Sequence, residues 1–151
     1  MKMSETKATL LEAPFELSYK YKRSSGPIMS QVFEGLAKKK ILGSKSTANK
    51  VYAPAAEYDP HTREALTELI EVGPGGIIES WSWVHQPSNH HLIQTPFAFA
   101  LIKLDGADTA MLHMISDCEK SDLTIGNRVK AVWSETPTES IADIQHFILD
   151  I

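Results

Sequence analysis

The sequence predicts a mainly β protein in which one helix and a turn-rich insert precede a five-stranded barrel. Apolar residues recur at helical spacing from Ile28 to Leu36, and the pattern changes at the glycine-rich segment 72–76. Short period-two strands then follow one another to the C-terminus. At 151 residues, the chain can hold one full-sized domain and a smaller subdomain. We therefore expect three parts, which are an N-terminal arm (1–26), a helix with a degenerate zinc-ribbon-like hairpin insert (27–73) and the barrel (74–151).

The N-terminal part combines the arm with the helix. Residues 1–26 show no clear period, and we expect this arm to become ordered only on a partner. Pro27 stands at the first-turn position where a missing N–H is tolerated, and Ser25 or Gly26 is placed to cap the helix. The insert that follows Gly43 is polar and rich in turn formers, so we expect two small hairpins there and no core.

The strands of the second half alternate in period two. We expect Ile77, Trp81 and Trp83 to share one face of their strand, and the near-continuous apolar run 97–104 to be buried on both sides. Asp105-Gly106 is a hairpin signal. Five strands, with a bridging turn at 122–126 between the third and fourth, are what a Greek-key barrel of OB type requires. The expected strands are 76–84, 97–104, 110–115, 129–133 and 144–149.

Composition excludes several classes of protein. The 42% apolar and 23% charged residues are typical of a globular protein, and no apolar run approaches the roughly 20 residues of a bilayer span. The N-terminus lacks a signal-peptide pattern, so we expect a cytoplasmic protein. A net charge of -4 disfavours nucleic-acid binding. Cys118 is the only cysteine, which leaves no internal disulfide and no cysteine-based zinc site.

Several motifs in order give the chain a family resemblance. These are PIMSQVFEGLAKKKILGSK, VYAPAAEYDP, GIIESWSWV, PFAFALIKLDGADTAMLHMIS and LTIGNRVKAVW. Together they resemble the zinc-ribbon plus OB-fold family catalogued as domain of unknown function thirty-five, from about Phe15 to the C-terminus. The resemblance implies that this chain binds a protein of the thiolase superfamily, and that acyl-CoA is held near the interface between the two.

The chain departs from that family at its zinc site. The positions that match the family's two cysteine pairs are Ser46 and Asn49, then about Asp59 and Thr62. These side chains do not form a tetrahedral thiolate cage, so we expect no zinc and no covalently bound cofactor. The folding energy that a metal supplies elsewhere must then come from turns, packing or a partner surface.

The cysteine-free insert EYDPHTREALTELIEVGPGG, with SWSWV and LDGADTAMLH, is most similar to the branch that pairs with steroid side-chain-cleaving aldolases. In that branch a thiolase-fold, lipid-transfer-protein-like subunit performs a retro-aldol cleavage of a hydroxyacyl-CoA side chain. The resemblance thus implies a non-catalytic accessory subunit of a hetero-oligomer, with acyl-CoA at the partner interface. Two alternatives stay open, which are a partner of a condensing thiolase or acyltransferase and a free-standing nucleic-acid-binding OB module.

The candidate contact residues for a partner or acyl-CoA come from the insert and from the loop between the first two barrel strands. OB barrels commonly contact ligands at such loops. A metal site is the alternative for the loop histidines, but neighbours in an extended segment point apart. The candidates are Tyr52, Tyr58, His85, His90 and His91.

No residue is assigned a catalytic role. Cys118 lies in SDCEKSD, where neighbouring acids raise the pKa of a thiol and blunt its reactivity. The sequence contains neither a G-x-S-x-G elbow nor a phosphate-binding G-x-x-x-x-G-K-[ST] loop. His113 alternates with Met111 and Ile115, so we expect it to be half buried with a hydrogen-bond partner.

Overall fold

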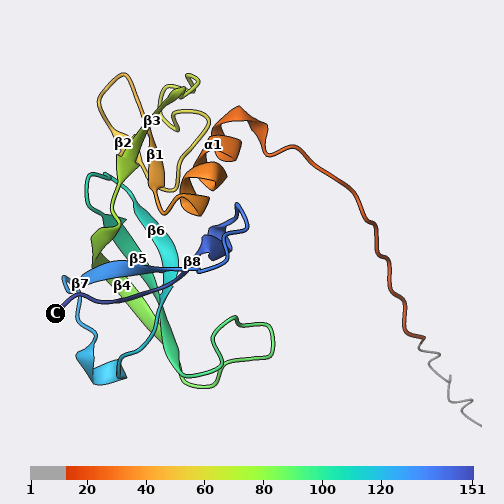
Figure 1. Ribbon diagram of the computed structural model, residues 1–151, viewed down its shortest axis with the longest axis vertical. Helices are drawn as coiled ribbons and strands as arrows, with labels where there is room; N and C mark the ends of the chain where they lie inside the picture. The colour runs from red at the N-terminus through yellow and green to blue at the C-terminus, as the bar shows by residue number, and fades with distance from the viewer. Residues whose placement is uncertain (1–12) are drawn as a thin grey trace, which may run out of the picture.

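The computed structural model describes residues 13–151, so the first part of the predicted arm lies outside the described residues. One helix and a three-stranded sheet precede a closed five-stranded barrel (Figure 1). The elements are α1 (Gly26–Ala37), β1 (Ile41–Lys45), β2 (Val51–Tyr52), β3 (Glu68–Val72), β4 (Gly75–Val84), β5 (Phe97–Leu104), β6 (Ala110–Ile115), the 3-10 turn η1 (Lys120–Asp122), β7 (Arg128–Trp133), the 3-10 turn η2 (Ile141–Asp143) and β8 (Ile144–Leu149).

The predicted mainly β fold with an OB-type barrel is confirmed. The barrel strands follow the order β4-β5-β6-β8-β7, and each predicted strand agrees with the structure to within one residue. All ladders of the barrel are antiparallel except the one between β6 and β8, which has the single Cα pair Ile115 and Phe147. The barrel closes through this one pair, and the rest of the β6 edge lies at a seam beside η2.

A bulge in β4 changes which side chains face the barrel interior. The register against β5 shifts between Ile78 and Ser80, so the alternation on the two sides of Glu79 is out of phase. As a result Ile78 is buried, whereas Ile77 is exposed and does not share a face with the partly buried Trp81. The prediction for Ile77 is wrong because a sequence period does not reveal one extra residue in a strand.

The insert forms a sheet that contributes to the core. Strands β2, β1 and β3 are antiparallel in that order, and Gly43 lies inside β1 instead of ending a pattern. A hairpin is present in β1 and β2, but the prediction that the insert has no core is wrong. Val51, Ala53 and Val72 are buried in one apolar cluster together with the helix residue Leu36 and the barrel interior.

The turn between β5 and β6 fastens this sheet to the barrel. The backbone N–H of Val51 donates to Asp108 Oδ2 at 2.8 Å, and the N–H of Asp108 donates to the carbonyl of Val51 at 2.8 Å. Thr109 Oγ1 accepts from the N–H of Ala53 at 2.8 Å and donates to its carbonyl at 2.9 Å. These four hydrogen bonds, the 108–109 latch, satisfy the edge of the two-residue strand β2 and fix its place against the barrel.

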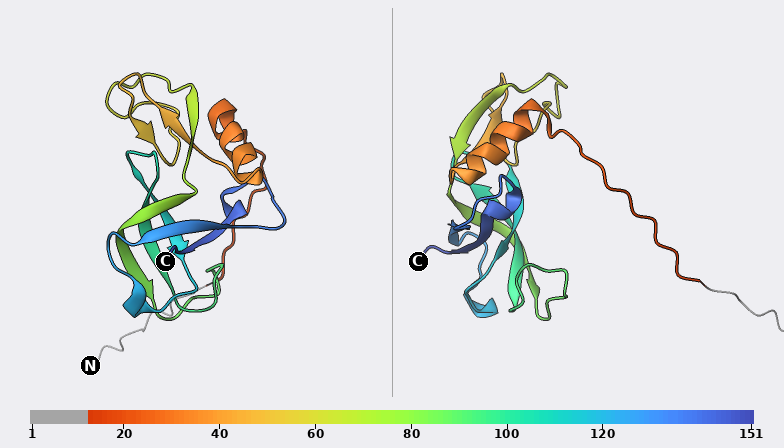
Figure 2. Two further views of the ribbon diagram at one scale, coloured as in Figure 1. Left: turned by 60° about the vertical axis from the view of Figure 1, so that its left-hand side comes forward. Right: turned by 45° about the vertical axis from the view of Figure 1, so that its right-hand side comes forward.

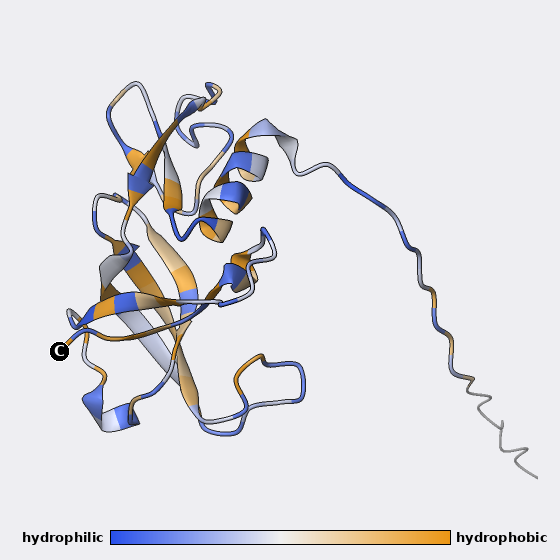
Figure 3. Cartoon of the chain, in the orientation of Figure 1, coloured by the Kyte–Doolittle hydropathy of each residue, from blue (hydrophilic) through white to orange (hydrophobic). Residues whose placement is uncertain are grey.

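The described part of the arm, residues 13–25, is exposed and forms no helix or strand. It leaves the body at the start of α1 and runs away from the barrel (Figures 1 and 2). The barrel itself shows apolar residues along β5, β6 and part of the long loop between β4 and β5 (Figure 3).

The latch predicts a stability effect at Thr109. Thr109→Val keeps the shape of the side chain but removes the hydroxyl, which leaves the buried N–H and carbonyl of Ala53 unpaired. We expect a loss of about 1–3 kcal/mol in the free energy of unfolding, measured by urea denaturation. Thr109→Ser retains the hydroxyl and should lose less stability. An equal loss of stability in the two variants would contradict a role for these hydrogen bonds.

Candidate functional site

The four positions that match the zinc-ligand positions of the similar family lie in two hydrogen-bonded turns. Ser46 Oγ accepts from the N–H of Lys50 at 3.1 Å, and the N–H of Asn49 donates to the carbonyl of Ser46 at 2.9 Å. Asp59 Oδ1 accepts from the N–H groups of His61 and Thr62 at 2.8 and 3.1 Å. Oxygen atoms of Ser46 and Asp59 thus hold the backbone of the turns where the resemblance places thiolates.

Both turns border one small hollow. Ser46 and Asp59 are buried and line a cavity of about 140 Å³ together with Glu64. The backbone N–H of His61 is the main cause that holds the pKa of Asp59 below its ordinary value, and the hydroxyl of Tyr52 adds to this by donating to Asp59 Oδ2 at 3.2 Å. Within residues 13–151, no group of three His, Cys, Asp or Glu side chains is placed to hold a metal ion.

The predicted contact residues fall into two separate regions. Tyr52 and Tyr58 belong to the insert, whereas the three histidines belong to the β4–β5 loop at the other end of the molecule (Figures 1 and 2). Tyr58 is 63% exposed, but Tyr52 is only 5% exposed, so its side chain offers little surface to a partner and instead supports the Asp59 turn. Burial is the main cause that raises the pKa of the Tyr52 hydroxyl.

The loop histidines do not converge on one point. His85 and His90 are exposed, and the ring of His85 lies edge-on to Trp83 at 6.5 Å. The ring of His91 packs edge-on against two phenylalanines of β5, at 5.3 Å from Phe97 and 5.9 Å from Phe99. His91 therefore anchors the loop on the outside of the barrel.

The outer face of β5 and β6 carries apolar side chains that the described chain leaves uncovered. Phe99 pairs with Met114 and Leu101 with Leu112, and all four side chains point outward. Leu101 is 41% and Leu112 63% exposed, so the prediction of burial on both sides of 97–104 is wrong at Leu101. Leu92 of the loop and Ile141 of η2 extend this surface at 76% and 54% exposure. We define the outer apolar face as Leu92, Phe99, Leu101, Leu112, Met114 and Ile141.

A groove runs through this face at the seam between β6 and η2. Its volume is about 220 Å³, and Leu92, Phe99, Leu112 and Ile141 are among its lining residues. His113 lies at its base and is 8% exposed, and its Nδ1 accepts the N–H of Met114 at 2.9 Å. Burial lowers the pKa of His113, so the ring is held in its neutral form and the groove carries no charge there.

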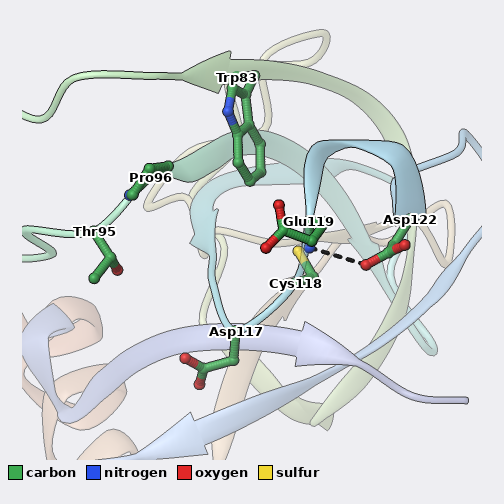
Figure 4. Close-up of a pocket in the computed structure, with 7 residues that line it drawn as sticks. All are labelled: Trp83, Thr95, Pro96, Asp117, Cys118, Glu119 and Asp122. Carbon is green, nitrogen blue, oxygen red and sulfur yellow. Dashed lines mark hydrogen bonds between the residues drawn. The ribbon is translucent and has the colours of Figure 1, made fainter.

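A second hollow, at the end of the barrel where β4 ends and β5 begins, is acidic. It measures about 500 Å³ and lies between Trp83 and the loop that carries Cys118 (Figure 4). Burial is the main cause that raises the pKa of the Cys118 thiol, and the carboxylates of Asp122, Asp117 and Glu119 add to it. Of the described residues, those that line this hollow include three acids and no base, so a phosphate-bearing ligand would be repelled from it.

The fold and these surfaces define a class of protein, an OB-type barrel with an attached helix and sheet and an uncovered apolar flank. Residues 69–134 match the family described as "ChsH2, C-terminal OB-fold domain". The chain is also similar to a solved protein of unknown function from the DUF35 family of Sulfolobus solfataricus, with a TM-score of 0.61 and 19% identity over 83% of each chain.

A further similar structure is described as "Ltp2-ChsH2(DUF35) aldolase". Its TM-score is 0.61 and its identity 19%, and the match covers 84% of this chain and 97% of that chain. No curated protein matches the chain. The predicted resemblance to the family of domain of unknown function thirty-five is thereby confirmed. No helix within residues 13–151 is long and apolar enough to cross a membrane.

The hydrogen bonds of Asp59 predict a pH dependence. Because the folded-state pKa of Asp59 is lowered, its ionised form stabilises the fold fully above the unfolded pKa of about 3.9, and this contribution is lost as the pH falls through the folded-state pKa. We expect Asp59→Asn to unfold at lower urea concentration than the natural protein at pH 7, with a gap that narrows below about pH 4. A gap that is independent of pH would contradict the role of the carboxylate.

The two turns also predict that the insert keeps its structure without zinc. We expect the purified protein to carry substoichiometric zinc by elemental analysis, and EDTA to leave its thermal unfolding midpoint unchanged. Stoichiometric zinc, or a chelator-induced fall of several degrees, would show that other residues bind the metal.

Proposed function

We propose that this chain is the non-catalytic accessory subunit of a two-protein aldolase. Its companion is a thiolase-fold, lipid-transfer-protein-like subunit that cleaves a steroid side-chain hydroxyacyl-CoA by a retro-aldol reaction. The observation that carries the proposal is the outer apolar face and the groove that runs through it. The relationship to the ChsH2 domain family and the likeness to the Ltp2-ChsH2(DUF35) aldolase support the choice of an aldolase.

The outer apolar face supports association with another protein. Antiparallel barrels usually present polar side chains on the outside, because one face of each strand meets water. Here two neighbouring strands present Phe99, Leu101, Leu112 and Met114 on that side, and exposed leucine and isoleucine side chains flank them. Contiguous apolar surface of this kind marks protein interfaces, and burying it on a companion would stabilise the complex by about 25 cal/mol per Å² of apolar area.

The chemistry of the described residues supports placing catalysis on the companion. The thiol of Cys118 has a raised pKa among carboxylates, which opposes formation of a nucleophilic thiolate. His113 is buried as a neutral ring whose Nδ1 already accepts a backbone N–H, so that nitrogen is not free to take a proton from a substrate. In the proposed complex the companion therefore supplies the acid and base groups.

Charge supports the same division for acyl-CoA. The phosphates of CoA are anionic, and the acidic hollow beside Trp83 is lined by Asp117, Glu119 and Asp122. The seam groove is apolar and suits side chains or an acyl tail, not phosphates. We therefore place the CoA phosphates on the companion, with this chain closing the complex around the acyl end.

One substitution on the outer apolar face tests the proposal. A C-terminally tagged chain expressed in its native cell should co-purify with a thiolase-fold protein in equal amount, identified by mass spectrometry. Leu112→Asp places a carboxylate in the desolvated interface, which should weaken association by more than about a hundredfold.

The matched control is Ile125→Asp, which changes a similarly exposed aliphatic side chain outside the outer apolar face. We expect it to retain the companion, and both variants to keep the thermal unfolding midpoint of the natural chain. If both variants retain the companion equally, the companion binds another surface of the chain. A natural chain that purifies alone would contradict the proposed function.

A further inference from the structure

The described part of the arm has an alternation of side chains that the fold does not use. Phe15, Leu17, Tyr19 and Tyr21 are 85, 65, 74 and 81% exposed. The residues between them, Glu16, Ser18 and Lys20, and the next residue, Lys22, are polar or charged. Four large apolar side chains at every second position, all in water, are unusual, because such a set loses favourable burial energy unless something covers it.

This spacing suits a strand and not a helix. In an extended backbone, residues two apart point to the same side, so the four apolar side chains form one face about 20 Å long. In a helix, each of these side chains would be rotated by about 200° from the one before it, so the four would form no common face. Tyrosine and phenylalanine favour strands, and Pro14 is compatible with the start of an edge strand.

The arm pairs with neither sheet of its own described chain. Residues 13–24 follow an extended course and take part in no ladder (Figure 1). Where the arm meets α1, the side chain of Ser24 accepts the N–H of Gly26 at 3.2 Å. The strands of the barrel close on one another, and the 108–109 latch already satisfies the edge of β2. Strand β3 is the other edge strand of its sheet, and the arm does not pair with it. Figure 2 shows the arm directed away from both sheets.

We propose that residues 15–21 bind the companion subunit by adding as a β-strand to an exposed edge of its sheet. This inference rests on the proposed function and specifies how part of the interface forms. Main-chain hydrogen bonds would supply affinity, and the odd-numbered side chains would cover an apolar surface beside that edge. Lys20, Lys22 and Arg23 give the arm's C-terminal half a positive charge, so the edge carries carboxylates at that end.

The charge distribution favours a protein over a nucleic acid as the partner. In the extended arm, the aromatic rings and the two lysines lie on opposite faces, whereas a single strand of nucleic acid needs stacking and phosphate contacts within one groove. The net charge of -4 on the whole chain also opposes phosphate binding.

Two variants of the full chain, each altering one face of the arm, test the proposal. The apolar-face variant carries F15S, L17S, Y19S and Y21S, and the matched polar-face variant carries E16S, K20S and K22S. Affinity for the purified companion is measured by titration of the untagged proteins. We expect the affinity of the apolar-face variant to fall by at least about a hundredfold, and that of the polar-face variant by no more than about tenfold.

Hydrogen exchange resolved to single amides tests the strand itself. An added edge strand directs alternate N–H groups to its neighbour, so we expect slowed exchange in the complex at every second residue of 15–21 and fast exchange in the free chain. Protection of the whole segment without alternation, or none, would overturn strand addition. Because the arm does not pack on the body in the structure, both variants should keep the natural thermal unfolding midpoint.

The outcomes separate this inference from the proposed function. Equal affinity of the two variants for the companion overturns the arm inference and leaves the accessory role intact. Failure of the natural chain to bind any companion contradicts both. A dimer of the chain alone that only the apolar-face variant abolishes, seen by light scattering, would make a second copy the partner and also overturn the inference.

Discussion

The 108–109 latch is the constraint on which the arrangement of this molecule depends. A two-residue strand cannot hold a three-stranded sheet in place, and here the side chains of Asp108 and Thr109 pair with the backbone of Val51 and Ala53. The latch brings Val51, Ala53 and Val72 into one apolar cluster with the barrel. The helix, the insert and the base of the arm are therefore oriented by the same turn that joins β5 to β6, the two strands of the outer apolar face.

The latch and the two turns together explain how the insert is stable without the ligands of a zinc ribbon. Ser46 and Asp59 use their side-chain oxygens to satisfy backbone N–H groups, and Tyr52 closes the second turn by donating to Asp59. Each turn is thus fixed locally, whereas a metal would tie the two turns to each other. The link between the insert and the rest of the chain comes instead from the latch and from burial against α1 and the barrel. The parts of the molecule are thus held together by packing, and the described residues leave the outer apolar face uncovered.

Much of the fold follows from local pattern, and most of the site does not. Period-two strands and the Asp105-Gly106 turn predict the barrel, because they reflect contacts close in sequence. The bulge at Glu79 and the sheet built on Gly43 escape prediction, since each depends on a partner strand. The run 97–104 predicts apolar faces on both sides of β5, yet it cannot say that Leu101 lies uncovered. The burial of Tyr52 also escapes prediction, because it depends on Asp59 and the core. The alternation in the arm is present in the sequence from Phe15 to Tyr21, and it becomes evident once the backbone is seen to be extended.

The central claim is that this chain acts through its surface, and turnover tests it most directly. A steroid side-chain hydroxyacyl-CoA is incubated with the chain alone, with the companion alone and with the two together, and release of the cleaved acyl-CoA is followed by mass spectrometry. The account predicts no cleavage by the chain alone and full activity only for the pair. Cleavage by the isolated chain at the rate of the pair would contradict it.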